Sequence, residues 1–264
     1  MKLTIRKAKP GEAGPVLDIL HQAFREYVGV LDPPSAVFRE TFKTIEAAIA
    51  AQGILLCLAN DYPIGCAFCE PKSDHLYIGR FGVLPEYRHY GAGSKMLEAA
   101  ECAALDHGFS VTRLTVRFGL DDLKSYYEFH GYEFVRQLSH EGYSGPTYVE
   151  LEKDLRRGES LFSYGTLQDS DVQISTFGRT LAGDADSASG FRLTQLAFDS
   201  SPVGYYFNAE KTGSDADRIV GTRFRIGLEE LLRSDDYEAD ADYERRLVRL
   251  DSGASAWIYS HVSR

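Results

Sequence analysis

A glycine-containing turn between a strand and a helix constrains this chain more than any other segment. Residues 76–83 are rich in strand formers, and residues 96–105 place apolar side chains at helical spacing. Arg88, Gly91 and Gly93 lie between them. Glycine lets backbone N–H groups approach a ligand, and a helix N-terminus adds unpaired N–H donors and the positive end of its dipole. The sequence therefore predicts a phosphate-binding turn.

Two other interpretations of this turn are open. A Rossmann dinucleotide site requires Gly-x-Gly-x-x-Gly early in a βαβ unit and an acidic residue about 20 residues later. Here roughly 85 residues precede the turn, and the first of the three key positions is Arg88 and not glycine. Both features argue against a Rossmann site. Taken alone, the turn is also compatible with an ordinary connection between a strand and a helix.

The order Arg-x-x-Gly-x-Gly after Val-x-Pro-Glu-Tyr resembles the pyrophosphate loop of the GNAT acyltransferase superfamily. Residues 123–132 resemble that family's helix with an aromatic-Tyr-Glu-x-x-Gly-aromatic sequence. The resemblance covers about residues 1–155 and implies acetyl-CoA or another acyl-CoA as co-substrate. It implies that Tyr127 protonates the leaving thiolate, which suits a phenol with a pKa of about 10; the alternative is a core aromatic. The implied cofactor-binding residues are Val83, Arg88, Gly91, Ala92, Gly93 and Ser94.

The acceptor side of this first domain is less defined. The resemblance implies a small primary amine as acceptor, because most of the superfamily transfers to nitrogen. The candidates for the general base are Glu26, Glu70 and a water held by Tyr77 or Arg80. Glu26 lies on the helix that commonly lines the acceptor pocket in the family. Arg80, in an otherwise apolar strand, is either a ligand for an acceptor carboxylate or a partly exposed strand charge.

The periodicity predicts an α+β chain of two domains, 1–155 and 160–264, joined by a charged linker at 152–159. For the first domain it predicts strands near 2–8, 53–60, 63–70, 75–84, 112–118, 132–138 and 146–152 and early helices near 12–28 and 36–51, and the resemblance implies that they form a GNAT-type mixed sheet. For the second it predicts a small β-barrel or curled sheet with one helix at 228–234, and strands near 160–164, 190–198, 204–207, 219–226, 246–250 and 254–261.

The second domain opens on Tyr164-Gly-Thr-Leu167, which resembles the entry motif of gamma-glutamylcyclotransferase-like proteins. Later segments at 218–226, 231–238 and 243–246 match that family in the same order. The resemblance implies that backbone N–H groups of Tyr164, Gly165, Thr166 and Leu167 bind substrate and stabilise an oxyanion. It also implies that Glu238 deprotonates the substrate's α-ammonium group, which then attacks its own γ-carbonyl and releases 5-oxoproline. Alternatively, Glu238 belongs to a solvated acidic face.

The charge, the apolar runs and the cysteines of the sequence limit the classes of ligand and partner that we expect. Up to residue 155 there are 16 basic and 21 acidic side chains, and after it 13 and 18, so neither half has the basic excess that nucleic-acid binding requires. No apolar run reaches the length of a membrane span. The four cysteines suit reduced core thiols in a cytoplasmic protein, not a metal or redox site. We expect small-molecule amine and gamma-glutamyl substrates, no metal, no nucleic acid and no membrane, and leave a homodimer open.

Three functions follow from these observations. The first is a bifunctional enzyme, an acyl-CoA-dependent N-acetyltransferase fused to a gamma-glutamylcyclotransferase. The second is an acetyltransferase whose second domain only binds or dimerises. The third is a regulatory protein that responds to acyl-CoA. Glu238 and the Tyr164-Gly165 pair favour the first over the second, and Tyr127 favours the first over the third.

Overall fold

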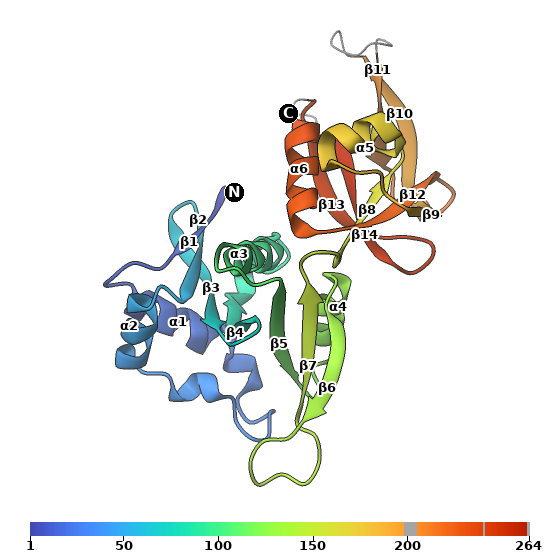
Figure 1. The fold of residues 1–264 in the computed structure, drawn as a ribbon. Helices are drawn as coiled ribbons and strands as arrows, with labels where there is room; N and C mark the ends of the chain where they lie inside the picture. Colours follow the sequence, from blue (N-terminus) through green and yellow to red (C-terminus); the bar gives the residue numbers. More distant parts are fainter. Residues whose placement is uncertain (198–204, 240, 263–264) are drawn as a thin grey trace. The chain divides into compact units, whose positions relative to one another are not determined.

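The structure is a computed structural model that describes residues 1–197, 205–239 and 241–262 (Figure 1). The chain divides into two compact units. Unit 1 comprises Met1–Glu128 and Tyr132–Lys153, and unit 2 comprises Phe129–Gly131 and Asp154–Arg264. The ends of two predicted strands, residues 198 and 204, lie outside the described residues.

Unit 1 is built on a seven-stranded mixed sheet, as the sequence predicted. In spatial order the strands are β1 (Leu3–Lys7), β2 (Ile54–Ala59), β3 (Tyr62–Pro71), β4 (Leu76–Val83), β5 (Val111–Arg117), β7 (Tyr148–Asp154) and β6 (Glu133–Leu138). The pairs β1–β2, β2–β3, β3–β4 and β6–β7 are antiparallel, whereas β4 and β5 run parallel.

Helices cover both faces of this sheet. Every residue of β2 is buried, which requires cover on both sides. A Cβ on Gly82 would touch Ala23 and Phe24 at the end of α1, whereas one on Gly65 would touch Met96 of α3, so these helices lie on opposite faces. The helices of unit 1 are α1 (Ala13–Ala23), α2 (Phe42–Ala50), α3 (Ala92–Asp106) and α4 (Asp121–Phe129), with the 3₁₀ turns η1 (Arg25–Tyr27), η2 (Ala36–Arg39) and η3 (Pro85–Tyr87). The predicted helices 12–28 and 36–51 are thus each part α-helix and part 3₁₀ turn.

The parallel strands β4 and β5 share only a short register. Their partners are Leu76 with Thr112 and Tyr77 with Arg113, near the start of both strands. Further along β4 the register with β3 shifts, and Arg80 has a φ of +45°, so a bulge interrupts the strand there. Beyond this point β4 and β5 separate, which leaves room between them for a ligand.

Unit 2 is a second α+β body, which agrees with the predicted fold class. Its five-stranded sheet has the order β13 (Tyr243–Arg249), β14 (Ser255–His261), β8 (Glu159–Ser163), β12 (Arg218–Ile226) and β9 (Gly183–Ser189). Strands β10 (Phe191–Ala197) and β11 (Tyr205–Lys211) form a separate two-stranded sheet. Helices α5 (Ser170–Phe177) and α6 (Leu228–Ala239) complete the unit.

The sequence missed two of these elements, β9 and α5, and predicted too short a range for three others, β11, β13 and α6. Strand β9 reads Gly-Asp-Ala-Asp-Ser-Ala-Ser, without the β-branched or aromatic residues typical of strands, and forms because it pairs along β12. Helix α5 is rich in poor helix formers and is delimited by Asp169 and by Gly178, whose φ is +75°. Helix α6 continues past the predicted end at residue 234 and carries Glu238 in its last turn. None of the helices in the described ranges is long and apolar enough to cross a membrane.

Candidate functional site

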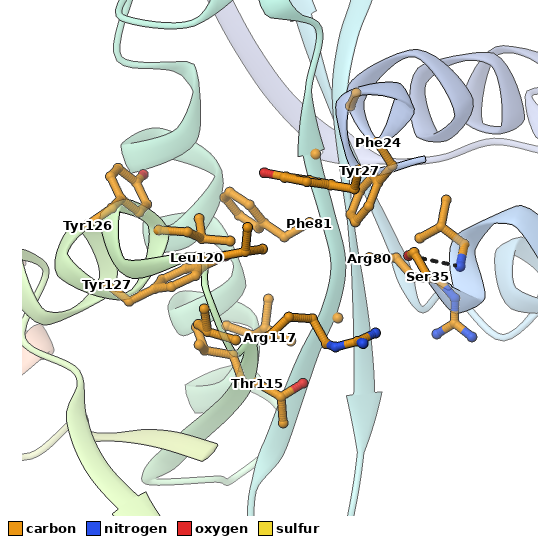
Figure 2. Close-up of a pocket in the computed structure, with 18 of the residues that line it drawn as sticks. Phe24, Tyr27, Ser35, Arg80, Phe81, Thr115, Arg117, Leu120, Tyr126 and Tyr127 are labelled. Carbon is orange, nitrogen blue, oxygen red and sulfur yellow. Dashed lines mark hydrogen bonds between the residues drawn. The ribbon is translucent and has the colours of Figure 1, made fainter. Parts of the chain in front are cut away.

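Unit 1 contains a cavity of about 1030 Å³ where β4 and β5 separate (Figure 2). Phe81 from β4 and Leu120 from the segment after β5 lie near its centre, between the tyrosines of α4 on one side and Phe24 and Tyr27 on the other. The wall also includes Val83, Gly91, Gly93 and Ser94, so the cavity extends to the predicted phosphate-binding turn.

The turn forms the N-terminus of α3. Gly91 is the N-cap residue, with a φ of +79° that an L-residue with a Cβ rarely adopts. Lys95 donates the first helical hydrogen bond, 3.1 Å to the carbonyl of Gly91, so the N–H groups of Ala92 and Gly93 have no acceptor within the helix. A Cβ on Gly93 would lie 2.7 Å from the Tyr126 hydroxyl, so a side chain there would force that hydroxyl to move. Backbone donors at a dipole's positive end can bind phosphate.

Arg88 lies at the same end of the cavity and is held in place. Its guanidinium donates to the carbonyls of Val83 at 3.3 Å and Ala23 at 3.1 Å, and it pairs with Glu26 at 2.7 Å. Glu26, predicted to bind substrate, therefore lies on η1 beside the phosphate-binding turn and is not among the residues that line the cavity. Its ion-pair partner is Arg88.

Tyr127 projects into the cavity from α4 and is almost fully buried, at 4% exposure. Its ring packs edge-on against Phe81, Tyr126 and Tyr132. Burial raises the pKa of the Tyr127 hydroxyl further above its usual value, so this group carries its proton at neutral pH. Burial also raises the pKa of Tyr126 to about 12, although a hydrogen bond with Ser94 opposes the shift.

Arg80 lines the cavity from the β4 bulge, but its guanidinium is already paired. Its Nε lies 2.5 Å from Glu40 and its Nη1 3.1 Å from Glu70, and the group stacks over Phe68 at 5.1 Å. Glu70 also pairs with Lys72, at 3.0 Å. Of the four suggested sources of a general base, only the residues predicted to hold a water, Tyr77 and Arg80, line the cavity.

Sequence reasoning missed several residues of the cavity wall. Arg117, at the end of β5, donates to the carbonyls of Pro33 at 2.7 Å and Thr147 at 3.4 Å. His140 lies 2.6 Å from the hydroxyl of Thr147, and burial together with nearby Arg117 lowers the pKa of its imidazole. Arg117 ends β5 and His140 follows β6, and no local pattern in the sequence brings them together.

In unit 2, the predicted substrate loop is fixed by its own side chains. The Tyr164 hydroxyl donates to the carbonyl of Tyr259 at 2.6 Å and accepts from the N–H of Ala209 at 3.0 Å. Thr166 shares a 3.0 Å hydrogen bond with the hydroxyl of Tyr237. Leu167 is buried, at 2% exposure, and its carbonyl accepts from Nε2 of Gln173 at 2.9 Å.

Glu238 lies close to this loop. Its charge acts on the hydroxyls of Tyr164, Tyr243 and Tyr259, which places it among them, and its neighbour Tyr237 is the partner of Thr166. Burial raises the pKa of Glu238 to about 7. Within the described part of the chain its carboxylate has no hydrogen bond or ion pair. The structure therefore brings the predicted base and the predicted loop together, and it does not make Glu238 part of an exposed acidic face.

Comparison with known families assigns both units. Residues 16–132 match the acetyltransferase (GNAT) family, and residues 161–263 match the family described as gamma-glutamyl cyclotransferase, AIG2-like. The chain therefore carries a GNAT acetyltransferase domain followed by a gamma-glutamylcyclotransferase-like domain, as its motifs predicted. No curated protein matches the chain. Among the residues that the structure describes, no group of three or more histidine, cysteine or acidic side chains could hold a metal ion.

Solved structures agree for the first domain. PaiA N-acetyltransferase from Thermoplasma acidophilum, in complex with coenzyme A, is 18% identical with a TM-score of 0.50, over 58% of this chain and 99% of that one. Ard1 from Thermoplasma volcanium is 18% identical with a TM-score of 0.49, over 58% and 98%. N-acetylglutamate synthase from Neisseria gonorrhoeae, complexed with coenzyme A and N-acetyl-glutamate, is 16% identical with a TM-score of 0.48, over 60% and 36%. At these identities the likeness to PaiA shows the fold alone.

Proposed function

We propose that unit 1 transfers an acyl group from acetyl-CoA, or another acyl-CoA, to a primary amine. The observation that carries this proposal is that one cavity joins the phosphate-binding turn at Gly91 and Gly93 to the buried hydroxyl-bearing residue Tyr127. A cofactor with a diphosphate at one end and a reactive thioester at the other matches that arrangement. The coenzyme A in the PaiA structure supports the same choice.

The residues present fit an acyl-CoA. The N–H groups of Ala92 and Gly93 can donate to the diphosphate, and Arg88 supplies a cation beside them. The pairing of Arg88 with Glu26 neutralises that cation, so we expect the diphosphate to compete with Glu26 for Arg88. The separated edge of β4 leaves backbone groups next to Phe81 that can bind the cofactor's amide-bearing arm.

Tyr127 then acts as the general acid. The amine nitrogen of the acceptor forms a bond to the acyl carbon, and the bond from that carbon to sulfur breaks. The Tyr127 hydroxyl gives its proton to the departing thiolate and is reprotonated from solvent, while the amine releases its own proton to water. Because the pKa of Tyr127 is raised by burial, the residue is fully protonated before each turnover.

Calorimetric titration of coenzyme A into the full chain tests the cofactor site. Gly91→Asp places a carboxylate at the phosphate-binding turn; at an effective dielectric constant of about 20, a like charge 4 Å away costs about 4 kcal/mol, so affinity should fall about 10³-fold. Gly108→Asp is the matched control, because Gly108 follows the other end of α3 with the same φ of +79°. Equal affinities in the two folded variants would remove the phosphate assignment.

For unit 2 we infer a cyclotransferase that releases 5-oxoproline from gamma-glutamyl compounds. The specific observation in favour is Glu238, a carboxylate of raised pKa without a partner among the described residues, next to the Tyr164–Leu167 loop. A base with a pKa of about 7 can take a proton from an ammonium group at neutral pH. The freed amine attacks the γ-carbonyl, the C–N bond to the leaving amine breaks, and that amine takes up the proton.

Production of 5-oxoproline from a panel of gamma-glutamyl amines and amino acids tests this second activity. Wild-type chain should form 5-oxoproline and the free amine in equal amounts, and Glu238→Gln should not. If the wild type forms none from the whole panel, the domain has a binding or dimerising role and the cyclotransferase assignment is wrong. The acetyltransferase assignment does not depend on this result.

A further inference from the structure

Three arginines line the cavity of unit 1, and two of them are neutralised locally. Arg80 lies against two carboxylates, and Arg88 pairs with that of Glu26. The guanidinium of Arg117 has no carboxylate within ion-pair distance in the part of the chain that the structure describes. Among the described residues, Arg117 is therefore the one cavity-lining arginine without an ion-pair partner, and Asp122, which also lines the cavity, is exposed to solvent.

The contacts of Arg117 hold it in position without neutralising it. Its Nη2 donates to Pro33 at 2.7 Å and its Nε to Thr147 at 3.4 Å, and both acceptors are neutral carbonyl oxygens. Asp32 is close enough to act electrostatically on Arg117, but its carboxylate accepts the hydroxyl of Tyr143 instead. Figure 2 shows Arg117 extended across the cavity toward the side where Ser35 and Arg80 lie. A guanidinium has five N–H groups, so donors remain for a ligand.

The surroundings of Arg117 make an uncompensated charge costly. Burial lowers the pKa of its guanidinium, which means that the charged form loses more from desolvation than it gains from the nearby Tyr143 and Asp32. The acidic side chain Glu150 also lines the cavity, but it pairs with Arg136 at 2.9 Å. A carboxylate is the ligand that matches a guanidinium in charge and in its forked geometry.

We propose that Arg117 binds a carboxylate of the acyl acceptor, so that the acceptors of unit 1 are amines that also carry a carboxylate, as amino acids do. This inference rests on the proposed acetyltransferase function and names its substrate class. The other polar groups of this wall are neutral hydroxyls: those of Tyr77 and Thr115 share a 2.8 Å hydrogen bond, and that of Ser35 accepts from the N–H of Val37, so its own hydrogen can be donated to an anion.

The first test compares acceptors with and without a carboxylate, and it uses the ratio of variant to wild-type kcat/KM for each acceptor because the amides also differ in the pKa of their amine. Full-length chain is supplied with acetyl-CoA and with amino acids or the corresponding amino acid amides, and kcat/KM is measured for each. The wild type should prefer the acids. Arg117→Gln should lower kcat/KM for the acids about 10- to 100-fold, mainly through KM, and leave the amides nearly unchanged. Arg117→Lys, which keeps the charge, should retain part of the preference.

The matched control is Arg113→Gln. Arg113 lies on the same face of β5 as Arg117, four residues earlier, but Glu152 neutralises it at 2.6 Å and it does not line the cavity. This variant should behave as wild type toward both acceptor classes. If Arg117 only holds the segments around Pro33 and Thr147 in place, Arg117→Gln lowers kcat/KM for acids and amides alike, and the proposal is overturned.

A binding test separates this proposal from the activity on which it rests. N-acetyl amino acids and their amides are titrated into the full chain with coenzyme A present, and saturation-transfer NMR reports binding without any turnover. The acids should bind to wild type and Arg113→Gln but lose their signal with Arg117→Gln. That result together with no acetyl transfer to any amine would leave the anion site standing and refute the proposed function. Equal signals with wild type and Arg117→Gln, or no signal from any acid, would overturn the anion site.

Discussion

Glu238→Gln should stabilise unit 2 at high pH while it abolishes release of 5-oxoproline. Burial raises the pKa of Glu238 to about 7, from 4.5 in an exposed setting. Between these values the folded chain holds a proton that the unfolded chain has lost, so the contribution of Glu238 to stability falls as the pH rises from 4.5 to 7. A glutamine has the same shape, does not ionise and escapes this loss.

The magnitude follows from the shift in pKa. One pKa unit corresponds to about 1.4 kcal/mol, so the raised pKa amounts to about 3 kcal/mol at pH 8 and to nothing well below pH 4.5. Because every other titrating group is shared, the difference between variant and wild type isolates position 238. Whereas stability at high pH should rise in Glu238→Gln, the rate of 5-oxoproline release should fall about 10²- to 10⁴-fold, as expected for a missing general base.

The chain contains a convenient probe for this measurement. Its single tryptophan, Trp257, lies on β14 of unit 2, where its Nε1 donates to Glu159 at 2.8 Å. Urea unfolding followed by tryptophan fluorescence at pH 4.5 and pH 8 therefore reports on unit 2. The stability difference between Glu238→Gln and wild type should grow by about 3 kcal/mol between these pH values. A difference below about 0.5 kcal/mol at both would refute the argument from burial and restore the acidic-face interpretation.

Three further predictions each test a single contact. Tyr127→Phe should lower the acetyl-transfer rate about 10²- to 10⁴-fold in steady-state kinetics while calorimetry finds unchanged coenzyme A affinity; a wild-type rate would make Tyr127 a packing residue. Gly93→Ala should weaken coenzyme A binding, since its Cβ would lie 2.7 Å from the Tyr126 hydroxyl, and adding Tyr126→Phe should restore binding if that contact is the cause. Gly221→Ala should destabilise unit 2 by about 3 kcal/mol in the tryptophan assay, because its Cβ would lie 2.2 Å from a carbonyl oxygen of β8, whereas Gly165→Ala, with open space at its Cβ, should change stability by less than about 1 kcal/mol.

The parts of the fold that depend on local chemistry could be predicted from sequence. Gly91 requires a backbone that only glycine adopts easily, Gly93 lies too close to the Tyr126 hydroxyl for a side chain, and the tyrosine helix around Tyr127 carries its own spacing. Both signals lie within a few consecutive residues. The mixed sheet of unit 1 could be predicted for the same reason, since each of its strands has a local pattern by which it can be recognised on its own.

The missed elements depend on contacts between distant residues. Strand β9 has no strand pattern of its own and exists because it pairs with β12. The same holds for Arg117, whose neighbours at Pro33 and Thr147 lie 84 and 30 residues away. No pattern in the sequence states which carboxylates neutralise which arginines, so the charge balance of the cavity required the structure.

The most direct test of the account is product analysis by mass spectrometry with the wild-type chain, Tyr127→Phe and Glu238→Gln. Each is incubated with acetyl-CoA, a panel of amino acids and a panel of gamma-glutamyl compounds. The account predicts N-acetylated amino acid, free coenzyme A and 5-oxoproline from wild type, selective loss of the acetylated product with Tyr127→Phe, and selective loss of 5-oxoproline with Glu238→Gln. Absence of acetylated product from the wild type, or loss of both products with either variant in its folded state, would contradict it.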